Sequence, residues 1–257
     1  MRTEFETVIC EVAADGVATI TLNRPAQRNA LNLQMAKDLY AAVKAVEAEE
    51  AARVVLIRGA GPTFCAGADL KERTGVSEAW LRNRRQTAFA AYNAIQWCEK
   101  PCIAVAHGPV IGSGCEIAVA CDFIIASTRA TFRWPEAVWG SVGASQRLPR
   151  IVGRAMAKEL LFTGRTIDAE EALRLRLVNR VVPPEELEAA VATTVGMILK
   201  AFPLSVRLAK RCIDVGMESD LRTGMDYEML AIDRCLADQE WKRGVEAFAA
   251  RNKSDQG

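Results

Sequence analysis

The fold is decided by residues 103–136, which read IAVAHGPVIGSGCEIAVACDFIIASTRATFRWPE. Apolar runs at 103–106 and 123–126 enclose a segment that contains a glycine-rich turn at 112–114. Short apolar runs bounded by glycine and proline are typical of buried strands, and small residues permit a tight turn into a helix. The stretch therefore predicts a strand, a turn, a helix and a second buried strand in succession.

Two glutamates lie in this stretch, in surroundings otherwise poor in charge. Glu116 follows the glycine-rich turn, so we expect it near the first turn of the helix, where backbone N–H groups lack an intrahelical partner. Glu136 follows Pro135 in a loop after a short strand. Either glutamate alone is more often a helix-dipole partner or a surface residue. Together they predict a site with two carboxylates beside backbone donors that could bind an oxyanion.

Strand, glycine-rich loop and helix also recur elsewhere in the chain, which predicts an α/β domain with buried, parallel strands. From residue 155 onward the pattern is mostly helical, and the segment after residue 200 has no glycine-rich turns. We expect that tail to serve docking or oligomerisation. The other expected elements are a hairpin of 7–12 and 17–22 around Asp15-Gly16, strands at 54–57 and 179–182, and helices at 31–50, 77–99, 155–162, 169–175, 185–201, 204–215 and 220–243.

Composition narrows the function classes. The chain has 257 residues, of which 50% are hydrophobic and 25% charged, with a net charge of +1 and no basic cluster that would indicate nucleic acid. No apolar run approaches the roughly 20 residues of a membrane span. The first residues lack the apolar segment of a signal peptide, and the eight cysteines form no C-x-x-C pair. These features predict a cytoplasmic protein with reduced thiols.

The single histidine, His107, limits the possible chemistry. A zinc site rich in histidine is excluded, and any nucleophilic triad would have to use this one residue. We expect a structural role, because His107 ends a buried strand before Gly-Pro. The turn at 112–114 lacks the third glycine of a dinucleotide-binding loop, and Ile111 occupies the position where a nucleophile elbow has glycine.

At these residues the chain closely resembles the enoyl-CoA hydratase/isomerase (crotonase) family. The resemblance runs in order from about residue 5 to the C-terminus. It implies a crotonase-like spiral of ββα units at 1–200 and a helical C-terminal oligomerisation region at 201–257, assembled as a homotrimer or as a hexamer made of two trimers. The matching pieces are NRP at 23–25, NAL at 29–31, FCAGADLK at 64–71, HG at 107–108, GSGCE at 112–116, DF at 122–123, Phe132, PE at 135–136, QRLPR at 146–150, VG at 152–153, LFTG at 161–164, DAEEA at 168–172 and LVNRVV at 177–182.

The resemblance also implies a reaction. Members of the family bind acyl-CoA thioesters and hold the thioester oxygen with two backbone N–H groups, which here would belong to Ala68 and Ser113. Glu116 and Glu136 occupy both catalytic carboxylate positions of the hydratases, so the expected activity is addition of water to a 2-enoyl-CoA, with no metal and no redox cofactor. The expected substrate-binding residues are Arg24, Arg28, Ala30, Ala66, Gly67, Asp69, Leu70, Lys71, Gly112, Trp134, Trp139 and Gly143, with the adenosine phosphates near Arg24, Arg28 and Lys71.

Some residues depart from the family pattern. Ser113 stands where many members have glycine, and Val142 and Ser145 replace a usual proline and glycine. With the bulk of Trp134 and Trp139, these changes predict an acyl pocket that differs from that of a simple straight-chain enoyl-CoA hydratase. The alternatives are an enoyl-CoA isomerase or another acyl-CoA lyase or hydrolase of the same fold, a catalytically idle relative, and an RNA-binding member. The last would need a lysine-rich helix, whereas 36–50 ends in glutamates.

Overall fold

The computed structural model describes the backbone of residues 2–254 and the side chains of 2–246 and 248. The chain divides into two compact units, Met1–Gly196 and Met197–Gly257. The division falls inside helix α7 (Leu187–Lys200), whereas the boundary expected from the sequence follows the last residue of that helix.

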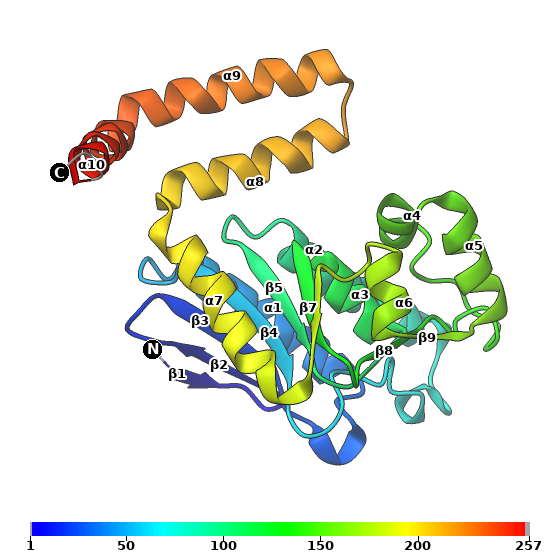
Figure 1. Ribbon diagram of the computed structural model, residues 1–257. Coiled ribbons are helices and arrows are strands. Elements are labelled where there is room, and N and C mark those ends of the chain that lie inside the picture. The colour runs from blue at the N-terminus through cyan, green and yellow to red at the C-terminus, as the bar shows by residue number, and fades with distance from the viewer. Residues whose placement is uncertain (1, 255–257) are drawn as a thin grey trace. The chain divides into compact units, whose positions relative to one another are not determined.

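A seven-stranded sheet forms the centre of the first unit (Figure 1). The first three strands pair antiparallel, and the expected hairpin connects the second and third of them around Asp15-Gly16. From β3 onward the pairs are parallel, as the continuous apolar runs predicted, and all five residues of β5 are buried. In spatial order the strands are β1 (Arg2–Glu4), β2 (Val8–Val12), β3 (Val17–Leu22), β4 (Val54–Gly59), β5 (Cys102–Ala106), β7 (Phe123–Ser127) and β10 (Arg180–Val182).

Helices cover both faces of this sheet. In Figure 1, α7 crosses the face opposite α1 (Leu33–Ala48), and an ion pair joins Arg58 of β4 to Glu188 of α7. Side-chain caps fix where two helices begin: Asn32 accepts a hydrogen bond from the Met35 N–H before α1, and Ser77 accepts one from the Trp80 N–H before α2 (Glu78–Gln96). The remaining helical segments of the unit are η1 (Pro25–Gln27), η2 (Lys71–Arg73), α3 (Ser113–Ala120), α4 (Arg147–Val152), α5 (Arg154–Thr163), α6 (Ala169–Arg174) and η3 (Pro184–Glu186).

A second, three-stranded sheet positions the two glutamates. Its strands β6 (Pro109–Ile111), β8 (Thr131–Arg133) and β9 (Thr166–Asp168) are each three residues long. Strands β6 and β8 pair in parallel, and the pairing continues as the Gly112 N–H donates to the Arg133 carbonyl at 2.9 Å. The helix that carries Glu116 and the loop that carries Glu136 therefore start side by side.

The second unit is helical, as expected, and consists of α8 (Pro203–Met217), α9 (Leu221–Asp238) and α10 (Glu240–Ser254). The single helix expected at 220–243 is instead two helices, because Gln239 adopts a left-handed conformation (φ 63°) that ends α9. Within the described residues no single helix is long and apolar enough to cross a membrane, and only the consecutive pair Pro184–Lys200 and Pro203–Met217 reaches that length and composition when joined across its bend.

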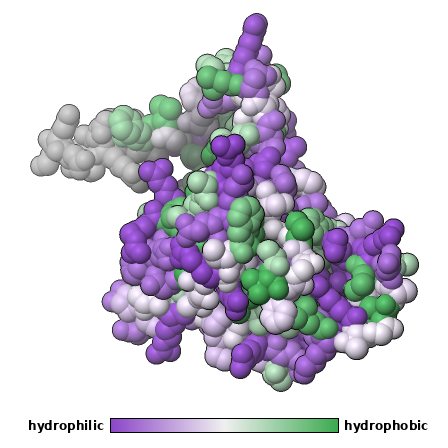
Figure 2. Space-filling model, turned by 90° about the vertical axis from the view of Figure 1, so that its right-hand side faces the viewer, coloured by the Kyte–Doolittle hydropathy of each residue, from purple (hydrophilic) through white to green (hydrophobic). Residues whose placement is uncertain are grey.

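Small patches of hydrophobic residues interrupt the polar surface of the face shown in Figure 2. Among the residues of the first unit, the loop at 137–145 exposes three large apolar side chains, Val138, Trp139 and Val142. This loop follows Glu136 directly, so the apolar exposure lies in the same segment as one of the predicted catalytic groups.

Gly114 makes a testable contribution to stability. A Cβ at this position would lie 2.4 Å from the Cys65 carbonyl oxygen, which is backbone and cannot move aside cheaply. We expect Gly114→Ala to lower the free energy of unfolding by about 1–3 kcal/mol through overpacking. The matched control is Gly196→Ala in α7, where a Cβ meets nothing within 4 Å, and which should be neutral or stabilising. Thermal unfolding of both variants checks this, and equal midpoints would contradict it.

Candidate active site

A cavity of about 540 Å³ contains the four residues predicted to be catalytic, Ala68, Ser113, Glu116 and Glu136. Its wall is built from the loop at 66–70, from α2, from the start of α3 and from the loop at 135–143. These segments lie far apart in the sequence and are brought together by the second sheet and by the packing of α2 on α3. The predicted catalytic residues therefore share one cavity.

Two backbone N–H groups in this cavity are free to bind an oxyanion. Leu31 and Ala68 form a parallel bridge, in which the Leu31 N–H donates to the Gly67 carbonyl (2.7 Å) and the Asp69 N–H donates to the Leu31 carbonyl (2.9 Å). Because the bridge uses the peptide groups on either side of Ala68, the Ala68 N–H points away from Leu31. Neither this N–H nor that of Ser113 has an acceptor within residues 2–254.

A second bridge holds the two donor segments together. The Cys65 N–H donates to the Pro109 carbonyl at 3.2 Å, and the Ile111 N–H donates to the Cys65 carbonyl at 2.9 Å. Gly112, at φ 49° and ψ −110°, then turns the chain into α3. Only glycine adopts this conformation readily, so the sequence turn at 112–114 is what aims the Ser113 N–H.

Glu116 lies on the first turn of α3 and is 5% exposed. Its Oε2 accepts a hydrogen bond from Arg147 Nη1 at 2.8 Å, while its Oε1 is buried with no hydrogen-bond partner in the described chain. The guanidinium of Arg147 is itself held by Gln96 Oε1 (2.8 Å) and Asn93 Oδ1 (2.6 Å), both from α2. Glu116 is therefore a fixed carboxylate with one oxygen left to accept a hydrogen bond.

Among the side chains that the structure describes, no cation pairs with Glu136. Its carboxylate lies over the glycine-rich turn, since a Cβ on Gly112 would be 3.0 Å from Glu136 Oε1, and a Cβ on Gly143 would be 3.0 Å from its Cγ. Its Oε2 is buried and, within residues 2–254, without a hydrogen-bond partner. Glycine at both positions leaves room for this carboxylate in the wall of the cavity.

The two carboxylates differ in electrostatic environment. Burial raises the pKa of Glu116 above its ordinary value, and the charge and hydrogen bond of Arg147 oppose that rise. Burial also raises the pKa of Glu136, and there the neighbouring charge of Glu116 adds to the rise. Arg147 thus favours the ionised form of Glu116, whereas Glu136 has no comparable cation among the described residues. Two carboxylates whose environments separate their proton affinities are typical of acid–base catalysis.

Comparison with known proteins identifies the family. The family model described as "Enoyl-CoA hydratase/isomerase" matches residues 13–256. The chain belongs to the enoyl-CoA hydratase/isomerase family. It is 39% identical to the crotonyl-CoA hydratase of Syntrophomonas wolfei, over 98% of each chain.

Solved structures give the same result for the fold. The crystal structure of an enoyl-CoA hydratase from Bacillus anthracis matches with a TM-score of 0.92 at 36% identity, over 96% of this chain and 97% of that one. That of a putative enoyl-CoA hydratase from Thermobifida fusca in complex with acetoacetyl-CoA matches with a TM-score of 0.83 at 31% identity, over 90% and 95%. The crotonase fold expected from the sequence is confirmed.

The predicted substrate-binding residues of this family member divide into two groups. Six of them line the cavity: Ala66, Gly67, Leu70, Gly112, Trp139 and Gly143. The others lie outside its wall: Arg24, Arg28, Ala30, Asp69, Lys71 and Trp134. Arg24 forms an ion pair with Asp69 (3.0 Å) and donates to the Ala30 carbonyl, whereas Trp134 is 0% exposed. Trp134 therefore packs in the core and is not part of the wall of this cavity.

Residues that the sequence reasoning did not assign also belong to the site. Arg147 lies in the QRLPR segment that carried part of the resemblance, and this was the signal that could have identified it. Tyr92 of α2 lines the cavity, and the nearby Ser113 side chain opposes the rise that burial causes in the pKa of Tyr92. Burial raises the pKa of Tyr92, so it stays a neutral phenol beside the Ser113 donor.

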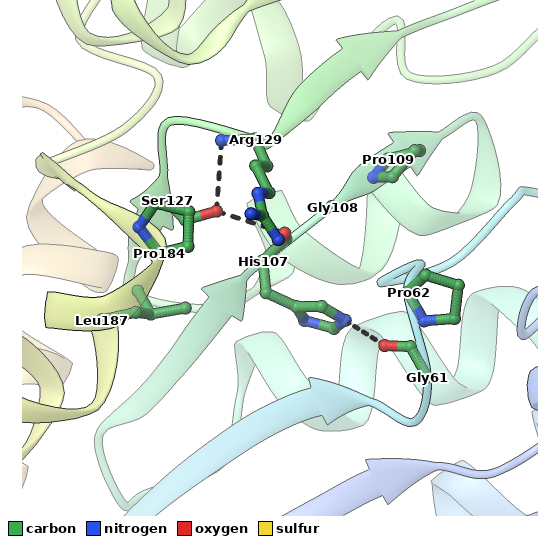
Figure 3. Close-up of a pocket in the computed structure, with 9 residues that line it drawn as sticks. All are labelled: Gly61, Pro62, His107, Gly108, Pro109, Ser127, Arg129, Pro184 and Leu187. Carbon is green, nitrogen blue, oxygen red and sulfur yellow. Dashed lines mark hydrogen bonds between the residues drawn. The ribbon is translucent and has the colours of Figure 1, made fainter.

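His107 lies in a different cavity, of about 450 Å³ (Figure 3). Its Nε2 is 2.8 Å from the Gly61 carbonyl oxygen, and its own carbonyl accepts a hydrogen bond from Ser127 Oγ at 3.2 Å. These contacts join the end of β5 to the loop after β4 and to the end of β7. The carboxylates and backbone donors line the other cavity, so they do not share a site with this imidazole.

Arg147 should control the pH dependence of the site. An ionised carboxylate pair is active above its apparent pKa and loses activity as the pH falls through it. Because Arg147 opposes the rise in the Glu116 pKa, Arg147→Met should move the acid limb of kcat/KM to higher pH. Arg150→Gln, an exposed change on the same helix, is the control. A pH profile of kcat/KM checks this, and an unmoved acid limb in Arg147→Met would refute the role.

Proposed function

We propose that the protein is an enoyl-CoA hydratase, which adds water across the 2,3 double bond of a 2-enoyl-CoA thioester. The observation that supports this is the pair of carboxylates, each with one buried oxygen that has no hydrogen-bond partner among the described residues, in the same cavity as two free backbone N–H groups. Hydration of a conjugated thioester needs both features. One stabilises the charge that develops on the thioester oxygen, and the other handles the water.

The backbone donors act on the carbonyl end of the substrate. When water adds at Cβ, electrons move from the double bond onto the thioester oxygen. The N–H groups of Ala68 and Ser113 are fixed by the two bridges and need no reorganisation to stabilise this enolate. Donors of this type are worth about 10²–10³ in rate each.

The carboxylates act on the water. Glu116 Oε1 and Glu136 Oε2 can each accept a hydrogen bond from it, which places its oxygen toward Cβ. Glu136 takes one proton from the water as the hydroxide adds at Cβ, and then delivers a proton to Cα as the enolate collapses. Glu116, kept ionised by Arg147, orients the water throughout. The product is a 3-hydroxyacyl thioester, and no electrons are gained or lost, so the reaction requires no redox cofactor.

Incubation with crotonyl-CoA tests the proposal. We expect the ultraviolet absorbance of the conjugated thioester to fall, and the product to carry oxygen from labelled water. Rearrangement of the double bond without oxygen incorporation would instead identify an isomerase. If the folded protein neither hydrates nor isomerises 2-enoyl-CoA thioesters of several chain lengths, the proposed function is wrong.

The expected surroundings of this reaction are also proposals. Arg28 and Lys71 are exposed and are the residues that we propose contact the adenosine phosphates, whereas the charge of Arg24 is paired with that of Asp69.

The cysteines of the described chain are all free thiols, which supports a reducing, cytoplasmic compartment. No residue of α8 is buried, and apolar side chains such as Met217 and Leu221 are exposed, which supports assembly through the second unit into a homotrimer or a hexamer. Light scattering after size exclusion measures that state.

A further inference from the structure

Three arginines line one part of the cavity: Arg73 from η2, and Arg84 and Arg85 from α2. Their charges are only partly balanced within residues 2–254. Glu72 accepts a hydrogen bond from Arg84 Nε at 2.7 Å, and Arg84 Nη2 also donates to the Leu31 carbonyl. The second oxygen of Glu72 is already used by the N–H of Leu33 at the start of α1 (2.8 Å). Each oxygen of the Glu72 carboxylate therefore already accepts a hydrogen bond, one from Arg84 and the other from the helix N-terminus, and neither is given to Arg73 or Arg85.

The guanidinium of Arg73 forms no ion pair within the described residues. Its Nε is buried and has no hydrogen-bond partner in the described chain. Burial and the nearby charges of Arg84 and Arg85 lower the pKa of Arg73, with only Glu72 and Tyr92 acting in the opposite direction. A guanidinium that is partly desolvated and unpaired is unfavourable unless an anion binds it. The guanidinium of Arg73 takes no part in the hydration steps proposed for the two glutamates and the backbone donors.

The position of the cluster points to the acyl part of the substrate. Along α2, Tyr92 lies about two turns after Arg84 and Arg85, and the Ser113 side chain is near enough to affect the pKa of Tyr92. The α2 residues of the cavity wall between these arginines and Tyr92, namely Ala88 and Phe89, are apolar. A chain that leaves a thioester held at Ala68 and Ser113 would pass methylenes along this wall and end at the guanidinium groups.

We propose that the acyl group of the substrate is a short dicarboxylic chain, whose distal carboxylate is bound by Arg73 with help from Arg85. The inference rests on the proposed function for the identity of the thioester end. The phosphates of CoA have the same chemistry as a carboxylate toward arginine, so the test separates these two sources of negative charge.

Binding of saturated thioesters tests the proposal without requiring turnover. Succinyl-, glutaryl- and adipyl-CoA are compared by calorimetry with butyryl-, pentanoyl- and hexanoyl-CoA, so that each pair differs only in the terminal carboxylate. We expect the wild type to bind at least one dicarboxylic thioester more tightly than its partner. In Arg73→Leu that preference should fall by about 10–100-fold, as expected for loss of a charge-assisted hydrogen bond, while the monocarboxylic thioester binds as before.

Two variants and one truncated ligand series make the result decisive. Arg73→Lys should keep part of the preference. Arg82→Leu, an exposed change on α2 outside the cavity wall, should keep all of it. The same acyl groups on N-acetylcysteamine lack the CoA phosphates. If Arg73→Leu weakens both members of a CoA pair equally and neither N-acetylcysteamine thioester, Arg73 binds CoA phosphate and the proposal is wrong. No dicarboxylic preference in the wild type would also overturn it. If the protein fails to hydrate crotonyl-CoA, the proposed function is contradicted, but the binding comparison can still be made and interpreted, because it requires no turnover.

Discussion

Glu136→Gln should reduce kcat for hydration of crotonyl-CoA by about 10²–10⁴-fold, the usual contribution of a positioned acid–base group. Glutamine keeps the size of the side chain and one acceptor oxygen, but it cannot take a proton from water or deliver one to Cα. Because the carboxylate packs against Gly112 and Gly143 and forms no ion pair with any described side chain, the exchange should cost little stability. KM should change much less than kcat. Steady-state kinetics and a thermal unfolding curve measure these effects.

A second readout separates proton transfer from general damage to the site. The wild type should exchange a Cα proton of the 3-hydroxyacyl thioester with deuterium from the solvent, and Glu136→Gln should lose that exchange. Glu78→Gln, on the exposed first turn of α2, is the matched control and should retain both activities. If Glu136→Gln keeps kcat within about tenfold of the wild type, a range smaller than general acid–base catalysis supplies, its assigned role is wrong.

Local signals in the sequence were sufficient for the main sheet. The apolar runs at 54–57, 103–106 and 123–126 predicted buried parallel strands, and Asp15-Gly16 predicted the hairpin, and the structure contains both. These predictions were possible because each depends on residues that are close together in the chain. The second sheet depends on long-range pairing of three-residue strands, such as Phe132 with Ile167, and such short strands carry almost no periodic signal. The break at Gln239 likewise has no glycine to mark it.

The same distinction explains what the sequence could say about the site. Glu116, Ser113 and Glu136 flank turns that are visible in one short stretch, so their joint placement could be predicted. Arg147 meets Glu116 across 31 residues, and the isolated charge of Arg73 depends on how Glu72 divides its two oxygens. Such pairings are properties of packing. Trp134 shows that closeness in sequence can also mislead: this bulky residue is two positions before Glu136, but its side chain is buried in the core.

Ser113→Pro should reduce kcat by about 10²–10³-fold, because it removes one donor to the developing oxyanion. The substitution is possible because Ser113 is the first residue of α3, a position where proline is tolerated since its N–H has no intrahelical acceptor. In this chain the Ser113 N–H has no acceptor among the described residues either, so no internal hydrogen bond is lost. The preceding residue is glycine, which is the residue best able to meet the backbone restriction that proline imposes.

Ser113→Ala is the control that isolates the N–H from the side chain. It removes the hydroxyl and its contact with Tyr92 but keeps the backbone donor, so kcat should stay within a few-fold of the wild type. Both variants should be compared at equal helix content, measured by circular dichroism, and in crotonyl-CoA turnover. A folded Ser113→Pro protein that turns over as fast as Ser113→Ala would mean that the oxyanion is stabilised elsewhere. A large loss in Ser113→Pro alone would assign the stabilisation to the backbone, where the glycine-rich turn holds it.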